Sequence, residues 1–312
     1  MPTSSRLAHT ARCVALGVRM ARPGFLVITL VACLVGMATA AAYGCGFSPS
    51  RAAATLALAL LAHAAANMLN DHEDARNGAD AANANGLFPF TGGSRLVQQG
   101  LVQAQDMRHL AMALLTVVVP GGLWLALQSG GGLVLLGLTG VLLGWAYSAP
   151  PLALMSRGVG ELAVAWAWGL VVVGADYVQC GQFFLIPSVA AVSYALLIAN
   201  ILIANGFPDA RSDAQVGKRT LAVRLGPGAG AIVYLILALL AHVWVAALVW
   251  AMVLPVQTLC ALASAPLALA AGAQLLHHGD QPARLRPALV LGIAAAVVHG
   301  LGLALGFWLV RV

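Results

Sequence analysis

Stretches of about twenty apolar residues, separated by short polar segments, follow one another along most of this chain. A helix needs about 20 apolar residues to cross the hydrocarbon layer of a bilayer. Only a short turn containing Pro255 separates the seventh stretch from the eighth, so eight spans are an alternative to nine. The pattern predicts an all-α, polytopic membrane protein. The nine predicted spans are 24–43, 52–70, 108–128, 131–149, 160–179, 183–204, 228–250, 254–275 and 288–310.

Composition excludes a water-soluble globule. Of the 312 residues, 61% are hydrophobic and 8% are charged, whereas soluble domains carry about 25% charged residues. A soluble protein of this size still needs a polar surface. Most of this chain is therefore expected to face lipid or other helices.

The positive charges orient the bundle. With nine spans and a cytoplasmic N-terminus, all but Arg51 and Arg311 of the 16 Lys and Arg residues lie in inner segments or at their border. Lys and Arg are retained on the cytoplasmic side of inserted helices. This topology explains the net charge of +6 better than a nucleic-acid partner does, because the basic residues are scattered over loops. The inner residues are Arg6, Arg12, Arg19, Arg22, Arg76, Arg95, Arg108, Arg157, Arg211, Lys218, Arg219, Arg224, Arg284 and Arg286.

The N-terminal segment admits two interpretations. Residues 1–22 are basic and precede an apolar run with an A-x-A pattern at Ala38 and Ala40, as in a signal peptide. A signal core is usually 7–15 residues long, and this run is longer, which favours an uncleaved first helix. The arginines before it suit a segment on an anionic membrane surface. We therefore expect a cytoplasmic basic segment at 1–22 and a single transmembrane domain at 23–312.

The five cysteines are far apart, with no CxxC pair and no neighbouring histidine cluster. The spacing suggests neither a zinc site nor a disulfide framework, and we expect packing or lipid-facing roles. They are Cys13, Cys33, Cys45, Cys180 and Cys260.

Acidic residues are rare and gather at two places. The first group, Asp71, Glu73, Asp74 and Asp80, follows the second span, and Asn67 and Asn70 precede it at helical spacing on the face of Asp71 and Asp74. The second group consists of Asn205, Asp209 and Asp213, each four residues apart. Pro208 is expected to break or kink the helix, which would leave Asp213 on a turn. In the nine-span topology both groups lie on the inner side.

Carboxylates on one face repel one another unless a cation lies between them. Magnesium prefers oxygen ligands and typically binds one or two carboxylates together with phosphate oxygens of a substrate. Two such groups around one cavity would hold a diphosphate through metal ions. The alternatives are acids that only cap helix ends, a cation-coupled transporter, whose acids are expected at mid-span, and a phosphatidyl-type transferase, whose aspartates are expected in one contiguous segment.

Basic and aromatic residues accompany both acidic groups. Arg95 ends the segment TGGSR, whose glycines permit a close backbone approach and whose arginine is suited to clamp a phosphate. Lys218 follows Asp213 closely. Tyr147 begins the segment YSAPP at the end of the fourth span and faces either the membrane interface or the reaction site. His72 is expected to point to water.

At these residues the sequence resembles the UbiA superfamily of intramembrane prenyltransferases. The resemblance covers roughly residues 24–310 and rests on three segments in order. They are Asn67-xx-Asn70-Asp71-xx-Asp74-xxx-Gly78-x-Asp80, then YSAPP (147–151), then Asn205-xxx-Asp209-xxx-Asp213 followed by GKRTLAVRLG (217–226). The resemblance implies a nine-helix bundle around a central cavity that opens to the cytoplasm and laterally to lipid. It also implies a multi-pass protein of the cell inner membrane.

The resemblance further implies an enzyme that transfers an isoprenoid chain from a prenyl diphosphate to an acceptor with Mg²⁺. The expected metal ligands are Asp71, Asp74, Asp209 and Asp213, with Tyr147 near the reacting carbon. The expected substrate-binding residues are Asn67, Asn70, Arg95, Asn205 and Lys218. The Gly78-x-Asp80 ending and the TGGSR segment resemble the 1,4-dihydroxy-2-naphthoate branch of menaquinone synthesis. The alternative acceptors are 4-hydroxybenzoate, homogentisate, a porphyrin or a glycerol phosphate lipid, and no protein partner is implied.

Overall fold

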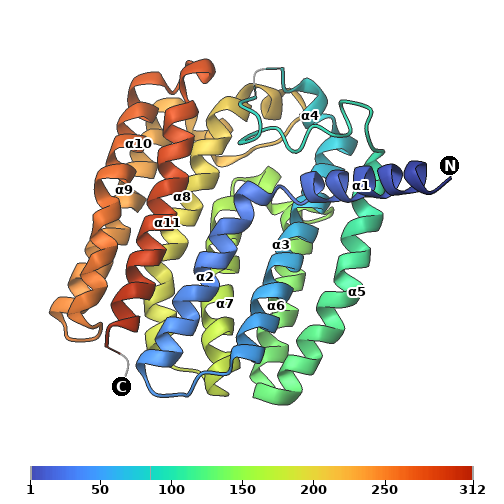
Figure 1. Cartoon of the computed structure of the whole chain (residues 1–312). Coiled ribbons are helices and arrows are strands. Elements are labelled where there is room, and N and C mark those ends of the chain that lie inside the picture. The colour runs from blue at the N-terminus through green and yellow to red at the C-terminus, as the bar shows by residue number, and fades with distance from the viewer. Residues whose placement is uncertain (1, 85, 311–312) are drawn as a thin grey trace.

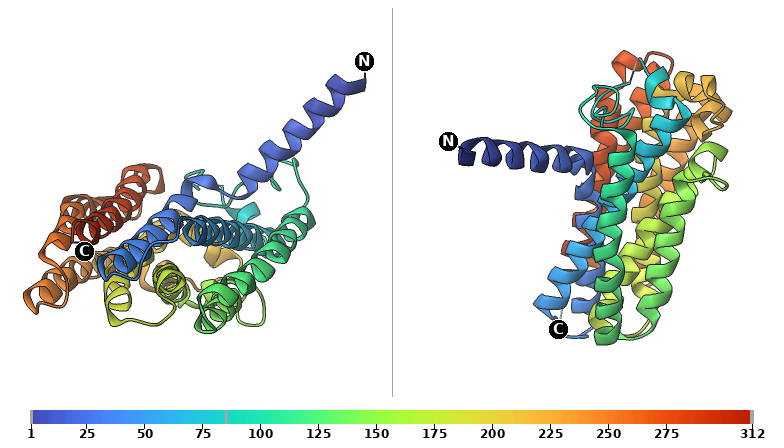
Figure 2. Two further views of the ribbon diagram at one scale, coloured as in Figure 1. Left: turned by 60° about the horizontal axis from the view of Figure 1, so that its bottom comes forward. Right: turned by 90° about the vertical axis from the view of Figure 1, so that its right-hand side faces the viewer.

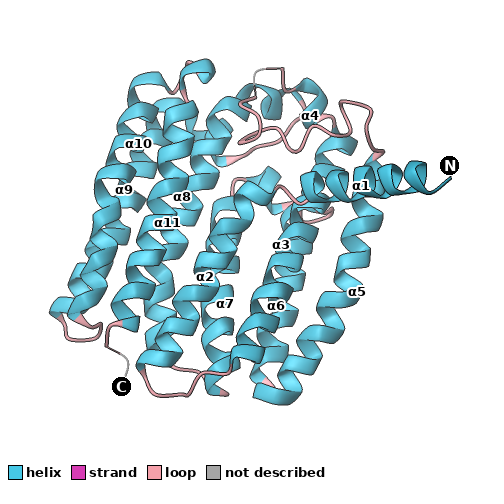
Figure 3. Ribbon diagram, viewed as in Figure 1, coloured by secondary structure: helices cyan, strands magenta, loops and turns pink. Residues whose placement is uncertain are grey.

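The structure of the chain is a computed structural model that describes residues 2–84 and 86–310, with the side chains of residues 2–10 outside the description. Every regular element within those residues is a helix (Figure 3). Arg311, which the predicted topology places outside, lies beyond the described residues, as does the side chain of Arg6. The elements are α1 (Pro2–Met20), α2 (Pro23–Ala42), α3 (Pro49–Asn77), α4 (Ala79–Ala82), α5 (Ala104–Ser129), α6 (Gly132–Ser148), η1 (Leu154–Arg157), α7 (Gly160–Cys180), α8 (Leu185–Gln215), α9 (Leu221–Trp250), η2 (Val256–Ser264), α10 (Ala265–His278), η3 (Pro282–Arg284) and α11 (Arg286–Trp308).

The long helices stand side by side in one bundle (Figure 1), and α1 projects sideways from it (Figure 2). Within the described residues, eight helical segments are long and apolar enough to cross a membrane, counting η2 and α10 as one. The predicted span 131–149 corresponds to α6, which has 17 residues and is shorter than the other eight. The polytopic all-α prediction is confirmed. Length and composition identify eight of the nine predicted spans, and the count of nine stays a prediction. We call the end of the bundle that carries α4 the α4 end, and the opposite end, which carries Cys45, the Cys45 end.

Two helices are longer than the apolar pattern predicted. The span 52–70 continues in α3 to Asn77, and the span 183–204 continues in α8 to Gln215. Pro208 lies inside α8 and does not end it, so the prediction of a turn at Asp213 is wrong. A proline removes one backbone hydrogen bond but has a helical φ, and the neighbouring Phe207 packs in a buried apolar cluster that holds this stretch of α8 in place. Both acidic groups therefore lie largely on helices that extend beyond the apolar core.

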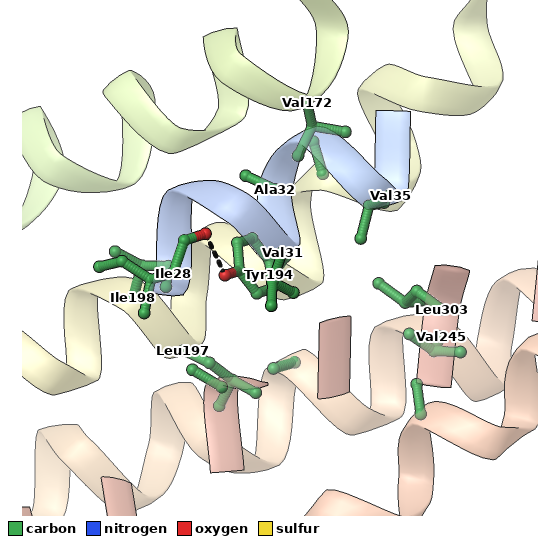
Figure 4. Packing of buried hydrophobic residues seen from close by; sticks show 14 of the residues in the cluster. Ile28, Val31, Ala32, Val35, Val172, Tyr194, Leu197, Ile198, Val245 and Leu303 are labelled. Carbon is green, nitrogen blue, oxygen red and sulfur yellow. Dashed lines mark hydrogen bonds between the residues drawn. The ribbon is translucent and has the colours of Figure 1, made fainter. Parts of the chain in front are cut away.

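Close packing between α2, α7, α8, α9 and α11 forms the largest buried cluster (Figure 4). Tyr194 on α8 lies at its centre and donates a hydrogen bond to the backbone oxygen of Ile28, at 2.6 Å. Gly36 lets α2 approach α7 so closely that a Cβ there would lie 2.1 Å from the oxygen of Val172. Small residues at such contacts are typical of helix association in lipid. This packing fixes α2, α7 and α8, which form walls of the cavity described below.

The Cys45 end is cross-linked, contrary to the prediction from cysteine spacing. Cys45, between α2 and α3, forms a disulfide with Cys180 at the end of α7. Nearby, Arg51 donates to the oxygen of Val178 at 3.0 Å. The spacing of 135 residues concealed this pair, because only the fold brings the two loops together. Asp176, for which the sequence offered no role, accepts a hydrogen bond of 2.7 Å from Thr39 on α2 in the same region.

We expect the Cys45→Ser variant to be less stable than the wild type when both are prepared under oxidising conditions. Loss of a native disulfide typically costs about 2–5 kcal/mol, and this one joins distant segments. Thermal unfolding of the purified protein in detergent measures the effect, with Cys260→Ser, which removes an exposed free thiol, as the control. Equal midpoints for Cys45→Ser and the wild type, with the wild type oxidised, would contradict a stabilising cross-link.

Candidate functional site

A cavity of about 240 Å³ lies at the α4 end, between α2, α3, α6, α7, α8 and the loop after α4. Its wall is charged towards the α4 end, where both acidic groups contribute, and apolar deeper in the bundle, where Ile28, Val164 and Ile198 line it. Of the predicted site residues, eight line the cavity: Asn67, Asn70, Asp74, Tyr147, Asn205, Asp209, Asp213 and Lys218. The structure thus brings together residues from segments more than 130 positions apart.

Lys218 joins the two acidic groups. Its Nζ lies 2.9 Å from Asp74 Oδ1 on α3 and 3.3 Å from Asp213 Oδ1 on α8. Burial lowers the pKa of Lys218, but the carboxylates of Asp74 and Asp213 outweigh that effect and raise the pKa above its ordinary value. The ammonium group therefore remains charged at neutral and mildly alkaline pH. It neutralises part of the negative charge where the two groups meet.

Asp209 is held by the loop after α4. Asn83 donates to Asp209 Oδ1 at 2.6 Å, and the backbone N–H of Gly92 donates to Oδ2 at 3.3 Å. The TGGS segment thereby reaches the second acidic group, although it follows the first in sequence. Its glycines allow a close backbone approach, as predicted, and the groups that they approach in this structure are carboxylates of the chain.

Asp71 lies directly behind the cavity wall rather than in it. Its Oδ2 accepts the backbone N–H of Ser94 at 2.9 Å, so the same loop holds one aspartate from each group. Its Oδ1 is buried without a hydrogen-bond partner among the described residues and lies 3.7 Å from Nη1 of Arg22. Arg22 and Gly93, both in the cavity wall, cover it.

Arg95 and His72 both have their bonding partners outside the cavity. The guanidinium group of Arg95 donates to the backbone oxygen of Asp80 and stacks over the ring of Phe88, at 4.7 Å from its centroid. Arg95 therefore folds the loop and does not face the cavity. His72 is buried and bonds through Nδ1 to the oxygen of Ala104 at 2.8 Å, so the prediction that it points to water is wrong.

The asparagines of the two motifs differ in their hydrogen bonds. Asn67 donates to the oxygen of Ala21 at 3.0 Å and fixes the junction of α1 and α2 against α3. Asn70 donates to Asp74 Oδ2 at 3.2 Å and lies 3.0 Å from the sulfur of Met155. The Oδ1 atom of Asn205 is buried without a partner in the described part of the chain. Asn205 therefore has a free acceptor oxygen beside the second acidic group.

The cavity wall carries an excess of negative charge. Five carboxylates line it, against the two cationic side chains of Arg22 and Lys218; the acids are Asp74, Asp80, Glu161, Asp209 and Asp213. Asp80, on α4, is buried, and burial together with the carboxylates of Asp74 and Asp71 raises the pKa of Asp80 to about 8. Burial and the neighbouring carboxylates thus both disfavour a further negative charge on Asp80.

The donor set fits a hard cation such as Mg²⁺ in part. Asp71 and Asn205 each present a buried oxygen without a hydrogen-bond partner, one from each motif. No three His, Cys, Asp or Glu side chains converge to metal-binding distance among the described side chains of residues 11–84 and 86–310. Magnesium usually binds to few carboxylates and completes its coordination with water and phosphate oxygens, so this arrangement suits a metal that arrives with a phosphate ligand.

Arg22 and Asn83 were not singled out from the sequence as site residues. Arg22 was counted only as a topogenic charge, yet it adopts a positive φ of 54° at the bend from α1 into α2 and lines the cavity. A non-glycine residue in that region often marks a functional position. Asn83 carries no sequence signal, because its partner Asp209 lies 126 residues away.

We expect Gly93→Ala to lower catalytic turnover about 10- to 100-fold. Gly93 has a φ of +71°, and a Cβ there would lie 2.8 Å from Asp80 Oδ2 and 2.9 Å from Asp71 Oδ1, so the loop and these two carboxyl groups must shift relative to each other. Small displacements of positioning groups have effects of this size. Gly100→Ala is the matched control, because Gly100 has a φ of +66° with nothing near its Cβ position. An equal loss of turnover in Gly93→Ala and Gly100→Ala would indicate that backbone strain alone causes the loss.

Comparisons with known proteins point to one family. Residues 29–293 match the model of the UbiA prenyltransferase family. The 1,4-dihydroxy-2-naphthoate octaprenyltransferase of Mycobacterium leprae is 36% identical over 51% of this chain and 52% of its own length, so the chain spans about half of that relative. The protein of the same description from Mycobacterium tuberculosis is 31% identical over 71% of this chain and 73% of its own length.

Solved structures show the same fold. A UbiA homologue from Aeropyrum pernix K1 superposes with a TM-score of 0.66 at 18% identity, over 89% of this chain and 96% of that one. A UbiA homologue from Archaeoglobus fulgidus, bound to DMAPP and Mg²⁺, gives a TM-score of 0.63 at 18% identity, over 95% and 99%. With the family model covering most of the chain, and with both aspartate motifs gathered around one cavity, this protein belongs to the UbiA prenyltransferase family.

Proposed function

We propose that this chain transfers an isoprenoid group from a prenyl diphosphate to 1,4-dihydroxy-2-naphthoate with the help of Mg²⁺. The observation that carries the proposal is the Asp74–Lys218–Asp213 bridge, which places both acidic groups at the mouth of one cavity with an apolar interior. The mycobacterial relatives described as 1,4-dihydroxy-2-naphthoate octaprenyltransferases support the acceptor. The Archaeoglobus fulgidus homologue bound to DMAPP and Mg²⁺ supports the donor and the metal.

The proposed roles divide along the depth of the cavity. Asp74, Asp209 and Asp213, with the oxygens of Asp71 and Asn205, hold the metal and diphosphate at the α4 end. When bound, Mg²⁺ offsets charge on the departing diphosphate. Lys218 and Arg22 add positive charge beside the same oxygens. We place Asn67 and Asn70 at the edge of this site and Tyr147 near the reacting carbon.

The apolar walls have a separate role. The allylic C–O bond breaks, an electron-rich aromatic carbon of the acceptor bonds to the allylic carbon, and a proton or CO₂ leaves the ring. Water would intercept the allylic carbon, and walls such as Ile28, Val164 and Ile198 exclude it. The lipid-soluble chain of the donor is a natural ligand for a cavity within a membrane bundle.

We further propose that the α4 end faces the cytoplasm across an inner membrane. The bias of Lys and Arg towards that end supports it. The Cys45–Cys180 disulfide at the opposite end supports it independently, because disulfides persist in oxidising compartments outside the cytoplasm. The two acidic groups lie at one end of the bundle rather than at mid-span, which favours the transferase over a cation-coupled transporter.

The test is an assay of the purified chain with radiolabelled prenyl diphosphates of several lengths and a panel of acceptors. We expect product with 1,4-dihydroxy-2-naphthoate, and none after removal of Mg²⁺ with a chelator. Product only with 4-hydroxybenzoate, homogentisate, a porphyrin or a glycerol phosphate lipid would correct the acceptor. No product with any acceptor would overturn the proposed function.

A further inference from the structure

The deep part of the cavity contains two polar groups that neither the metal site nor a hydrocarbon chain explains. His63 on α3 and Trp168 on α7 both line it. His63 precedes Asn70 by two helical turns, and Trp168 follows Glu161 by the same interval, which places both roughly 10 Å further into the bundle than the charged mouth. They lie among apolar neighbours such as Val164.

The two rings form one unit. Their centroids are 4.9 Å apart, and their planes meet at 88°. His63 Nδ1 lies 2.8 Å from the hydroxyl oxygen of Thr29 on α2, which fixes the orientation of the imidazole ring. That contact occupies Nδ1 and leaves Nε2 for a ligand.

The indole N–H of Trp168 is buried and has no hydrogen-bond partner among the described residues. A buried donor without a partner is costly, and native structures usually satisfy it with protein, water or ligand. A polyprenyl chain has no hydrogen-bonding atom beyond its diphosphate, so it cannot serve as the partner. A ring oxygen of an aromatic acceptor can do so.

We propose that Trp168 and His63 form the subsite for the oxygen-bearing ring of the acceptor. Trp168 Nε1–H donates to one ring oxygen, and His63 Nε2 makes a second hydrogen bond to a hydroxyl group of the same ring. The ring then lies deeper in the bundle than the diphosphate, between the apolar walls. This inference rests on the proposed prenyl transfer and adds the residues that select and orient the acceptor.

The test separates acceptor binding from donor binding. In the purified chain, Trp168→Phe keeps the aromatic contact with His63 and removes only the N–H. We expect it to raise the KM for 1,4-dihydroxy-2-naphthoate about tenfold while the KM for the prenyl diphosphate stays within about twofold of wild type. His63→Phe is expected to act in the same direction. Trp166→Phe, at a position 61% exposed on the same helix, is the matched control and should leave both KM values unchanged.

Binding of labelled prenyl diphosphate without acceptor verifies that each variant is folded. Retained donor binding together with a raised acceptor KM supports the subsite. An unchanged acceptor KM in both variants of an active enzyme overturns the subsite and leaves prenyl transfer intact, as does an equal rise in both KM values. Absence of any transfer by the wild type would overturn the proposed function and this inference together.

Discussion

Asp209→Ala and Asp71→Ala are expected to lower turnover by about three orders of magnitude or more while the helical bundle remains folded. Each carboxylate belongs to one motif, and the same loop holds both, through the N–H groups of Gly92 and Ser94. Loss of either removes an oxygen ligand for the metal and releases one end of that loop. A thousandfold loss corresponds to about 4 kcal/mol of transition-state stabilisation. The measurement is steady-state prenyl transfer at saturating Mg²⁺, with circular dichroism as the check of folding.

The control for these variants is Asp280→Ala. Asp280 is an exposed acid in the loop between α10 and α11, at the same end of the bundle but outside the cavity. Its removal should leave turnover within about twofold of wild type. Full activity in Asp71→Ala or Asp209→Ala would count against the metal and diphosphate assignment, whereas an equal loss in Asp280→Ala would indicate a general effect of surface charge.

Lys218→Met is expected to lower turnover about 100- to 1,000-fold, the usual effect of losing one preorganised electrostatic group. It should also destabilise the metal-free protein, because Asp74 and Asp213 then face each other without the ammonium group between them. Mg²⁺ should restore part of that stability, so the rise in melting temperature on adding Mg²⁺ should be larger in the variant than in the wild type. Both quantities are measured on the same detergent-purified samples.

Arg219→Met is the control for Lys218→Met. Arg219 is exposed, lies outside the cavity and is the next residue in the chain. Its replacement therefore tests whether loss of a positive charge that orients the helices has an effect by itself. A variant Lys218→Met with normal turnover, or with no altered response to Mg²⁺, would contradict the bridging role of this lysine.

Local sequence patterns predicted the helices but not their ends. Apolar runs report the part of a helix that lies in the hydrocarbon layer, and they stop where polar residues begin. The stretches from Asp71 to Asn77 in α3 and from Asn205 to Gln215 in α8 are polar and helical. Their continuation depends on neighbours across the bundle, such as Lys218 between Asp74 and Asp213, which a window of the sequence does not contain.

Arg95 and Arg22 show that local sequence patterns are equally limited in predicting which side chains form the site. Both are arginines next to a motif or a span, and the sequence favoured Arg95 as the phosphate clamp. The fold directs Arg95 to backbone oxygens of its own loop and Arg22 into the cavity. The direction of a long side chain is set by tertiary packing, and neighbouring sequence positions carry little information about it.

The sequence by itself determined that this is a polytopic helical membrane protein with two asparagine- and aspartate-led motifs, because hydrophobicity and helical spacing are local properties. Only the tertiary structure decided which residues meet. It linked Cys45 with Cys180, placed the TGGS loop on Asp71 and Asp209, and set His63 against Trp168. The physical reason is that such contacts join segments far apart in the chain, so their partners are chosen by packing of the whole bundle.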